Sequence, residues 1–222
     1  MTTGTARRAE VPHFLRIERL GRRDYGETLA LQTARRDAVL AGAPDHLLLV
    51  EHLPVITIGR GGDERHVLRR SAPVVRVNRG GDVTYHGPGQ LVGYPILDLA
   101  RRGADVHRYL RELESMLIDV AGAFGVRAER CPGRTGVWIG NDKLAAIGVG
   151  VRRWVTMHGF AINVADVRDA FAAIVPCGLA DSGVTSLSAA SARTIDLGAV
   201  EQAVCEAFRA RFGYTVAEQA EA

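Results

Sequence analysis

The segment from Arg79 to Gln90 restricts the possible folds of this 222-residue chain more than any other segment does. Five of its twelve positions are glycine or proline, in two groups, Gly80-Gly81 and Gly87-Pro88-Gly89. Glycine permits positive φ angles and close backbone approach, and proline fixes φ, so each group predicts a tight turn. A hairpin with two tight turns is one interpretation. The Arg, Asp, Tyr and His side chains between the turns favour the other, a ligand-binding loop. The segment matches neither the dinucleotide-binding nor the P-loop pattern.

Short runs of leucine and β-branched residues surround this segment and are mixed irregularly with amphipathic stretches. They predict strands at 13–20, 47–51, 55–59, 74–77, 91–96, 126–128, 135–139, 144–151 and 155–164, and helices at 24–40, 105–124, 166–174 and 197–212. The order is not a regular βαβ alternation. We therefore expect an α/β (α+β) fold with a single domain, in which helices flank a mixed, largely antiparallel sheet. The domain should span 13–213, with a flexible N-terminal tail at 1–12 and a C-terminal tail at 214–222.

Composition excludes several classes of function. No apolar run approaches the roughly 18 residues of a membrane span, and the polar start lacks the apolar core of a secretory signal. We therefore expect a cytoplasmic protein without a membrane partner. The net charge of +3 and the aromatic content of 6% give no nucleic-acid-binding pattern. A mild basic excess is compatible with an acidic protein partner.

Lysine occurs once among the 28 basic residues, at Lys143. It follows a predicted turn at Asn141-Asp142 and begins a predicted strand. A lysine at such a position most often lies in a hairpin and faces solvent. Lysine nevertheless differs from arginine in that its amine gains and loses a proton readily, so a chemical role for Lys143 stays open.

The three cysteines are an odd number without CxxC spacing, which argues against disulfides and a zinc site. Cys177 lies between Pro176 and Gly178, in a turn where a thiol is often accessible; a nearby cation would favour its thiolate. A Cys177–His86–Asp82 triad is conceivable, although spacing cannot test it. The histidines are too dispersed for a metal motif, so no metal is expected. Cys205, inside the last predicted helix, is expected to be structural.

Together these segments resemble a known family. Arg79-Gly-Gly-Asp-Val-Thr-Tyr-His-Gly-Pro-Gly-Gln-Leu-Val-Gly-Tyr-Pro-Ile96 is similar to the signature of the octanoyl-[acyl carrier protein]:protein octanoyltransferases. The likeness extends over about residues 14–212. It continues at Thr57-Ile-Gly-Arg60, Gly136-Val-Trp138, Lys143 with Ile147-Gly148, His158-Gly-Phe-Ala161 with Asn163, Pro176-Cys-Gly178 and Thr185-Ser-Leu187.

The resemblance implies the fold of lipoate and biotin protein ligases. It also implies a reaction in which octanoate moves from octanoyl-acyl carrier protein to the ε-amine of a lysine on a lipoyl domain. Such domains belong to 2-oxoacid dehydrogenase complexes and to the glycine cleavage H protein. The donor is already a thioester, so the resemblance implies no cofactor and no ATP. We further expect a monomer.

The resemblance also implies roles for individual residues. Cys177 would be the nucleophile that carries the acyl group as a thioester. Lys143 would stabilise the thiolate by its charge and then act as general acid and base. The substrate-binding positions implied in the same way are Arg79, Gly80, Gly81, Asp82, Val83, Thr84, Tyr85, His86, Ala146, Ile147, Gly148, Gly159, Phe160 and Ala161.

Two alternatives remain at this point. An ATP-dependent lipoate or biotin protein ligase of the same fold would need a lysine but no cysteine nucleophile, and the Pro176-Cys177-Gly178 turn favours the transferase. A non-catalytic acyl-binding module would need neither Cys177 nor Lys143, and the presence of both argues against it.

Overall fold

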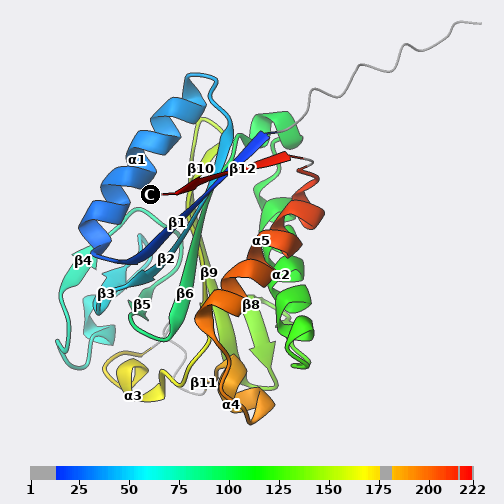
Figure 1. Cartoon of the computed structure of the whole chain (residues 1–222). Coiled ribbons are helices and arrows are strands. Elements are labelled where there is room, and N and C mark those ends of the chain that lie inside the picture. The colour runs from blue at the N-terminus through cyan, green and yellow to red at the C-terminus, as the bar shows by residue number, and fades with distance from the viewer. Residues whose placement is uncertain (1–13, 176–181, 215, 222) are drawn as a thin grey trace, which may run out of the picture.

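The structure is a computed structural model that describes residues 14–175, 182–214 and 216–221. A nine-stranded sheet runs through its centre, with the strands in the order β12-β1-β2-β6-β10-β9-β8-β7 and with β11 beside β9 (Figure 1). Its members are β1 (Phe14–Arg23), β2 (Asp45–His52), β6 (Gln90–Ile96), β7 (Glu129–Cys131), β8 (Arg134–Ile139), β9 (Asp142–Arg152), β10 (Val155–Asn163), β11 (Gly183–Val184) and β12 (Val216–Glu221).

The expected mixed, largely antiparallel sheet is confirmed. The pairs from β2 to β7 along the strand order are antiparallel, whereas β1 pairs in parallel with β2 and β12, and β11 pairs in parallel with β9. A separate three-stranded sheet contains β3 (Val55–Ile58), β4 (Val74–Arg76) and β5 (Val83–His86), in the order β4-β3-β5.

Helices cover both faces of the large sheet (Figure 1). On one face lies α1 (Tyr25–Leu40), which packs on β10 and β6 over a small core that includes Leu48 and Val92. On the other face lie α2 (Val106–Ala123) and α5 (Leu197–Phe212), which pack on each other and enclose the larger core, with Leu113, Leu117 and Phe208 fully buried.

Side chains at the helix ends explain where the long helices begin and stop. Asp24, Asp105 and Asp196 each accept a hydrogen bond from a backbone N–H of the first turn, which otherwise lacks a partner. Gly213 ends α5 in the left-handed conformation, with φ of +67°. The predicted helix at 197–212 agrees with the structure, and those at 24–40 and 105–124 begin one residue later than predicted.

The hairpin interpretation of the Arg79–Gln90 segment is wrong. β5 pairs with β3 in the small sheet, whereas β6 pairs with β2 and β10 in the large one. The turn at Gly87-Pro88-Gly89 therefore carries the chain from one sheet to the other. This places the polar residues of the segment between two sheets.

Other expectations also need correction. Residues 126–128 are not a strand, because the short edge strand β7 begins only at Glu129. The helix expected at 166–174 is reduced to α3 (Arg168–Phe171), and the Asp166 carboxylate binds Arg168 in a local turn. The predicted domain end at residue 213 is too early, because Tyr214 is buried and Val216–Glu221 forms β12 beside β1.

Three further short elements complete the fold: the 3₁₀ turns η1 (Glu64–His66) and η2 (Leu99–Arg102), and α4 (Leu187–Ser191). α3 packs with the small sheet over Ile56, Tyr85 and Phe171. In the described part of the chain, no helix combines the length and apolarity needed to cross a membrane.

Candidate active site

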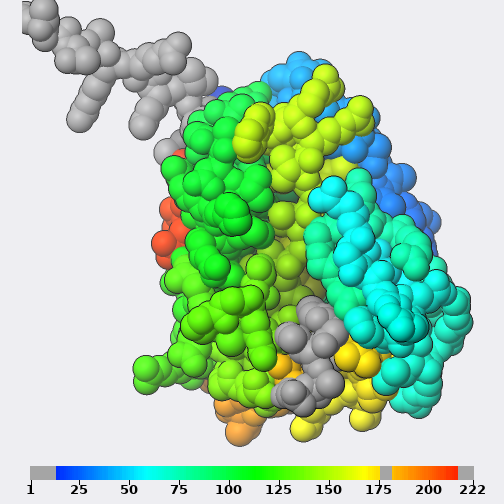
Figure 2. Space-filling model, turned by 180° about the vertical axis from the view of Figure 1, so that it is seen from behind, coloured from blue at the N-terminus to red at the C-terminus, as the bar shows by residue number. Residues whose placement is uncertain are grey.

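A cavity of about 480 Å³ lies where the small sheet faces β9 and β10. Seen from behind, the surface is hollowed between the cyan segment that includes β3 and β4 and the green segment that includes α2 (Figure 2). The loop before β5, the middle of β9 and the middle of β10 supply most of the lining, and Tyr25 of α1 and Tyr94 of β6 close one side.

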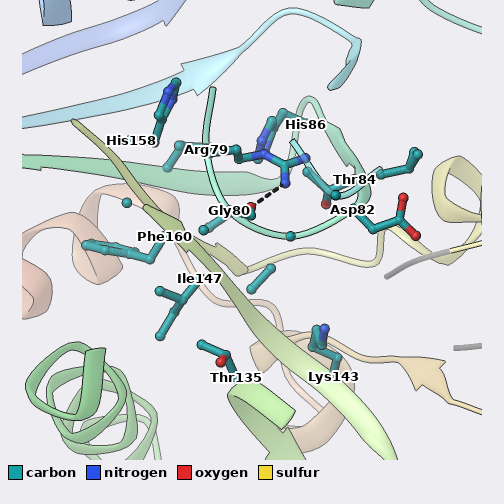
Figure 3. A pocket seen from close by; sticks show the side chains of 18 of the residues that line it. Arg79, Gly80, Asp82, Thr84, His86, Thr135, Lys143, Ile147, His158 and Phe160 are labelled. Atoms are coloured by element: carbon teal, nitrogen blue, oxygen red, sulfur yellow. Dashed lines mark hydrogen bonds between the residues drawn. The ribbon is translucent and has the colours of Figure 1, made fainter. Parts of the chain in front are cut away.

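The loop that begins at Arg79 is fixed by its own backbone and by β3. Gly81 has a φ of +85°, and a Cβ on Gly59 would approach the Gly81 carbonyl oxygen to 2.4 Å, so both positions require glycine. The guanidinium of Arg79 is buried and donates to the carbonyl oxygens of Gly80 and Thr57 and to Thr57 Oγ1, at 2.9–3.0 Å. The loop is therefore pre-formed around its arginine (Figure 3).

The two strands β9 and β10 form the opposite wall. Their antiparallel register places Ala146 opposite Ala161, Ile147 opposite Phe160, and Gly148 opposite Gly159. Two of the residue groups implied by the resemblance, 146–148 and 159–161, are therefore neighbours across one pair of strands. This wall is largely apolar and suits an aliphatic chain.

Lys143 lies at one end of the cavity. Its Nζ is 4.7 Å from the centroid of the Trp138 ring, which is buried, and the Arg134 guanidinium approaches the same ring at 5.6 Å. An ammonium over an aromatic face is stabilised by the ring quadrupole. Lys143 is thus a half-buried residue of the cavity wall rather than a solvent-facing hairpin lysine.

Histidine and tyrosine side chains, among them His158, His86, Tyr25 and Tyr94, gather toward the other end of the cavity, which we call the inner end. His158 lies opposite Val149 in the register, six positions along β9 from Lys143, which is about 20 Å of strand. In Figure 3, His158, Arg79 and His86 lie toward one end, Lys143 and Thr135 lie toward the other, and Ile147 lies between them. The cavity is therefore elongated, with an amine at one end.

Three histidines in this region are neutral at physiological pH: His158 and His86, which line the cavity, and His52, whose ring centroid lies 6.0 Å from that of His86. Burial, reinforced by the charge of Arg79, lowers the pKa of His158 to about 4. Burial also lowers the pKa of His86 to about 3 and that of His52 to about 4. His52 Nε2 lies 2.7 Å from the Tyr94 hydroxyl, and its Nδ1 lies 3.2 Å from the Arg23 carbonyl oxygen. The carbonyl only accepts, so Nδ1 carries the proton and Tyr94 donates to Nε2.

The conceivable Cys177–His86–Asp82 triad lacks its Asp–His link. His86 Nδ1 lies 2.7 Å from Gln90 Oε1, whereas Asp82 Oδ2 lies 2.5 Å from Nδ1 of His66. The other oxygen of Asp82 accepts the backbone N–H of Asp63 at 3.0 Å. Asp82 thus ties the glycine-rich loop to η1.

With one exception, the substrate-binding residues implied by the resemblance line the cavity. The exception is Tyr85, whose ring packs edge-on against Phe171, 5.9 Å away between centroids. Successive side chains of a strand point to opposite faces, so Tyr85 faces away from its neighbours Thr84 and His86. The roles of all the implied residues in binding a substrate stay predictions.

Several lining residues were not predicted: Tyr25, Gly61, Val92, Tyr94, Gly133, Arg134, Thr135 and His158. They come from distant segments, and local pattern gives no signal for most of them. Val92, Tyr94 and His158 carried one signal, because each lies within a motif of the resemblance. The backbone φ of His158, +56° within a strand, is the kind of strain that occurs at binding sites.

The predicted nucleophile, Cys177, lies outside the described residues. Of the two cysteines that the structure describes, Cys205 is buried in α5 and burial raises its pKa. This environment agrees with the structural role expected for Cys205. Cys131 is partly exposed in β7 and is not part of the cavity lining.

Comparisons with known proteins show the family to which the chain belongs. A family model described as the lipoyl protein ligase A/B catalytic domain matches residues 24–209. The octanoyltransferase of Geobacter metallireducens is 55% identical over 193 residues, which cover 86% of this chain and 91% of the relative. The octanoyltransferase of Gloeobacter violaceus is 57% identical over 155 residues, covering 69% and 68% of the two chains.

Solved structures show the same fold at low identity. Lipoate-protein ligase A bound with ATP superposes with a TM-score of 0.73 at 16% identity, covering 93% of this chain and 87% of that chain. Biotin protein ligase from Aquifex aeolicus gives a TM-score of 0.52 at 11% identity, covering 90% and 69%. Taken with the sequence matches, the chain belongs to the lipoyl protein ligase A/B catalytic-domain family, within which it is an acyltransferase related to the octanoyltransferases.

Proposed function

We propose that this enzyme transfers an octanoyl group from octanoyl-acyl carrier protein to the ε-amine of a lysine on a lipoyl domain, through a thioester on Cys177. The observation that carries the proposal is the position of Lys143, a lysine at one end of an elongated, largely apolar cavity. An aliphatic chain in that cavity gains about 0.8 kcal/mol for each methylene removed from water.

The reaction has two halves. In the first, the Cys177 thiolate attacks the carbonyl carbon of the donor thioester, and the C–S bond to the carrier breaks. The carrier leaves as a thiolate and then takes the proton of the Lys143 ammonium, so Lys143 becomes a neutral amine that can accept a proton in the second half. In the second, the acceptor amine attacks the new thioester. The amine loses a proton to Lys143, the C–S bond breaks, and Cys177 is released as the amide forms. Both halves start from thioesters, so ATP is not required.

The partners follow from this chemistry. The donor is the acyl carrier protein, and the acceptors are the lipoyl domains of 2-oxoacid dehydrogenase complexes and the glycine cleavage H protein. We propose that the enzyme acts as a monomer in the cytoplasm and needs no metal or cofactor. The names of the relatives support the transferase over the ATP-dependent ligase.

The test is the intact mass of the protein after incubation with octanoyl-acyl carrier protein in the absence of ATP. Wild type should gain one octanoyl group, and Cys177→Ala should gain none. Cys131→Ala is the matched control, because Cys131 lies in an edge strand and is not part of the cavity lining; it should load like wild type.

Two outcomes would favour the alternatives. Acceptor modification that requires ATP and free octanoate would identify a ligase. Tight octanoyl binding without any covalent product would identify an acyl-binding module.

A further inference from the structure

Two buried amide side chains connect the cavity wall to the strand that carries Lys143. Gln90 is 2% exposed and Asn163 is 4% exposed. Gln90 Oε1 lies 2.7 Å from His86 Nδ1, Gln90 Nε2 donates to Asn163 Oδ1 at 2.8 Å, and Asn163 Nδ2 donates to the Thr185 carbonyl oxygen at 2.9 Å. These contacts form one continuous series from His86 to Thr185.

The carbonyl oxygen of Thr185, the last acceptor, determines which group donates in every hydrogen bond of the series. A backbone carbonyl only accepts, so the amide nitrogen of Asn163 must face Thr185, and its oxygen must face Gln90. Gln90 then presents its own oxygen to His86, so His86 Nδ1 carries the proton. His86 Nε2 is left as an acceptor. Reversing either amide would place two acceptors or two donors together.

The series ends at Lys143. The backbone N–H of Thr185 donates to the Lys143 carbonyl oxygen at 3.1 Å, and β11 pairs with β9 so that Val184 lies in register with Lys143. Gln90, Asn163 and Lys143 also line the same small cavity of about 20 Å³, next to the larger one. The two amides therefore border the same small cavity as Lys143, and Asn163 also binds the segment whose Thr185 N–H donates to the Lys143 backbone.

We propose that Gln90 and Asn163 are positioning residues that fix the place of Lys143 for proton transfer from the acceptor amine. This inference rests on the proposed function, because it concerns the second half of that reaction. A general base must lie within hydrogen-bond reach of the proton that it removes. The attraction between an ammonium and a thiolate instead falls only as the inverse of their distance. A small displacement of Lys143 should thus slow amine transfer far more than acyl loading.

Asn163→Asp tests the last link with almost no change in volume. The introduced carboxylate still accepts from Gln90 Nε2, but its second oxygen faces the Thr185 carbonyl oxygen, and two acceptors repel each other. We expect acyl loading on Cys177 near the wild-type rate. Amine transfer from the loaded enzyme should fall by about 10- to 100-fold, since misplacements of about 1 Å cost rates of this order.

The same variant has a signature in its pH profile. When protonated, the introduced carboxyl donates to Thr185 and restores the link, and burial raises the pKa of such a carboxyl. The transfer rate of Asn163→Asp, divided by that of wild type at the same pH, should therefore rise as pH falls. The deficit should appear in the maximal transfer rate and not in the acceptor concentration for half-maximal rate.

Two further variants keep the test decisive. Gln90→Glu replaces the donor facing Asn163 with an acceptor and should also slow transfer more than loading. Gln32→Glu is the matched control: Gln32 is fully buried and accepts the backbone N–H of His158, and it is outside the series of hydrogen bonds from His86 to Thr185. Any effect of this buried carboxylate should leave the ratio of the two half-reactions unchanged. All rates refer to protein shown to be folded by its thermal unfolding transition.

Failure of this inference differs from failure of the proposed function. Wild type that forms no acyl-enzyme rejects the proposed function. Wild type that loads and transfers, with Asn163→Asp transferring at the wild-type rate throughout the pH range, rejects the positioning role. So does a loss in Gln90→Glu that is equal in both half-reactions and matches that of Gln32→Glu.

Discussion

The Nζ atom of Lys143 lies 4.7 Å from the centroid of the Trp138 ring, so the amine at the end of the cavity rests on an aromatic face. Trp138 reaches this position from β8, the neighbour of β9 in the sheet, and its ring is 1% exposed. The buried Trp138 ring offers the amine a fixed aromatic face against which to pack. The side chain of Lys143 is thus oriented by Trp138, while its backbone is bound by Thr185.

Trp138→Leu should slow amine transfer more than Trp138→Phe. Phenylalanine keeps an aromatic face under the ammonium, and leucine does not. Cation–π attraction of about 0.5–2 kcal/mol corresponds to a difference of about 2- to 30-fold between the two variants. Single-turnover transfer from pre-loaded enzyme measures this difference. Both variants lose core volume, so equal transfer rates at equal folded fraction would show that the aromatic face does not matter.

Ile147→Phe should shift the preference of the enzyme toward shorter acyl chains. Ile147 lines the middle of the cavity opposite Phe160, and a larger ring there takes space from the chain. Each methylene excluded from the cavity costs about 0.8 kcal/mol, or about 4-fold in loading efficiency. The measurement is the ratio of octanoyl to hexanoyl loading rates.

Val151→Phe is the control for that experiment. Val151 lies on the same strand but is 37% exposed and is not part of the cavity lining. Its substitution should leave the octanoyl-to-hexanoyl ratio unchanged. An unchanged ratio in Ile147→Phe as well would mean that the acyl chain does not pass this residue.

The sequence predicted the elements whose signals are local. The 197–212 helix has an aspartate before it, a glycine after it and an apolar face between them, and it has these bounds in the structure. The elements that failed depend on distant partners. Residues 216–221 carry no strand pattern of their own, and they form β12 only beside β1. The Arg79–Gln90 segment reads as a hairpin locally, but its two strands join different sheets.

In the candidate site, too, the features with a local sequence signal were predicted, and those that depend on distant partners were not. The motifs that line the wall were found, because each is contiguous in sequence. The closure of the inner end by Tyr25 and Tyr94 was not found, because only the fold brings α1 and β6 to the same cavity. That the Tyr85 side chain packs on Phe171 and does not line the cavity follows from the alternation of side chains along β5, which the resemblance does not take into account.

Tyr214→Phe should destabilise the protein although it removes a single oxygen. The Tyr214 hydroxyl donates to Asp45 Oδ2 at 2.6 Å, and the other oxygen of this buried carboxylate accepts the Asp98 N–H. A hydrogen bond to a charged group contributes about 1.5–3 kcal/mol, so the free energy of unfolding should fall by that amount. Urea denaturation measures the change. A loss below about 0.5 kcal/mol would show that Asp45 finds another donor.

His86 and His158, which line the cavity, and His52, which packs near His86, should make the fold sensitive to acid. Burial lowers the pKa of His52 and His158 to about 4 and that of His86 to about 3, against 6.5 in the unfolded chain. The unfolded state therefore binds more protons below pH 6.5, and the free energy of unfolding falls as pH decreases from 6.5 toward 4. Each histidine contributes up to about 1.4 kcal/mol per pH unit in this window.

Replacing one of these histidines isolates its share of the acid sensitivity. The slope of the unfolding free energy against pH is proportional to the number of protons taken up on unfolding. Between pH 6 and 4.5, this number should be lower by about one proton in His52→Gln than in wild type. His107→Gln is the control, since His107 is exposed and lies on α2, away from the cavity lining. Urea denaturation at several pH values gives the slopes. A wild-type free energy that stays level from pH 6.5 to 5 would mean that the inner end of the cavity accepts protonated histidines.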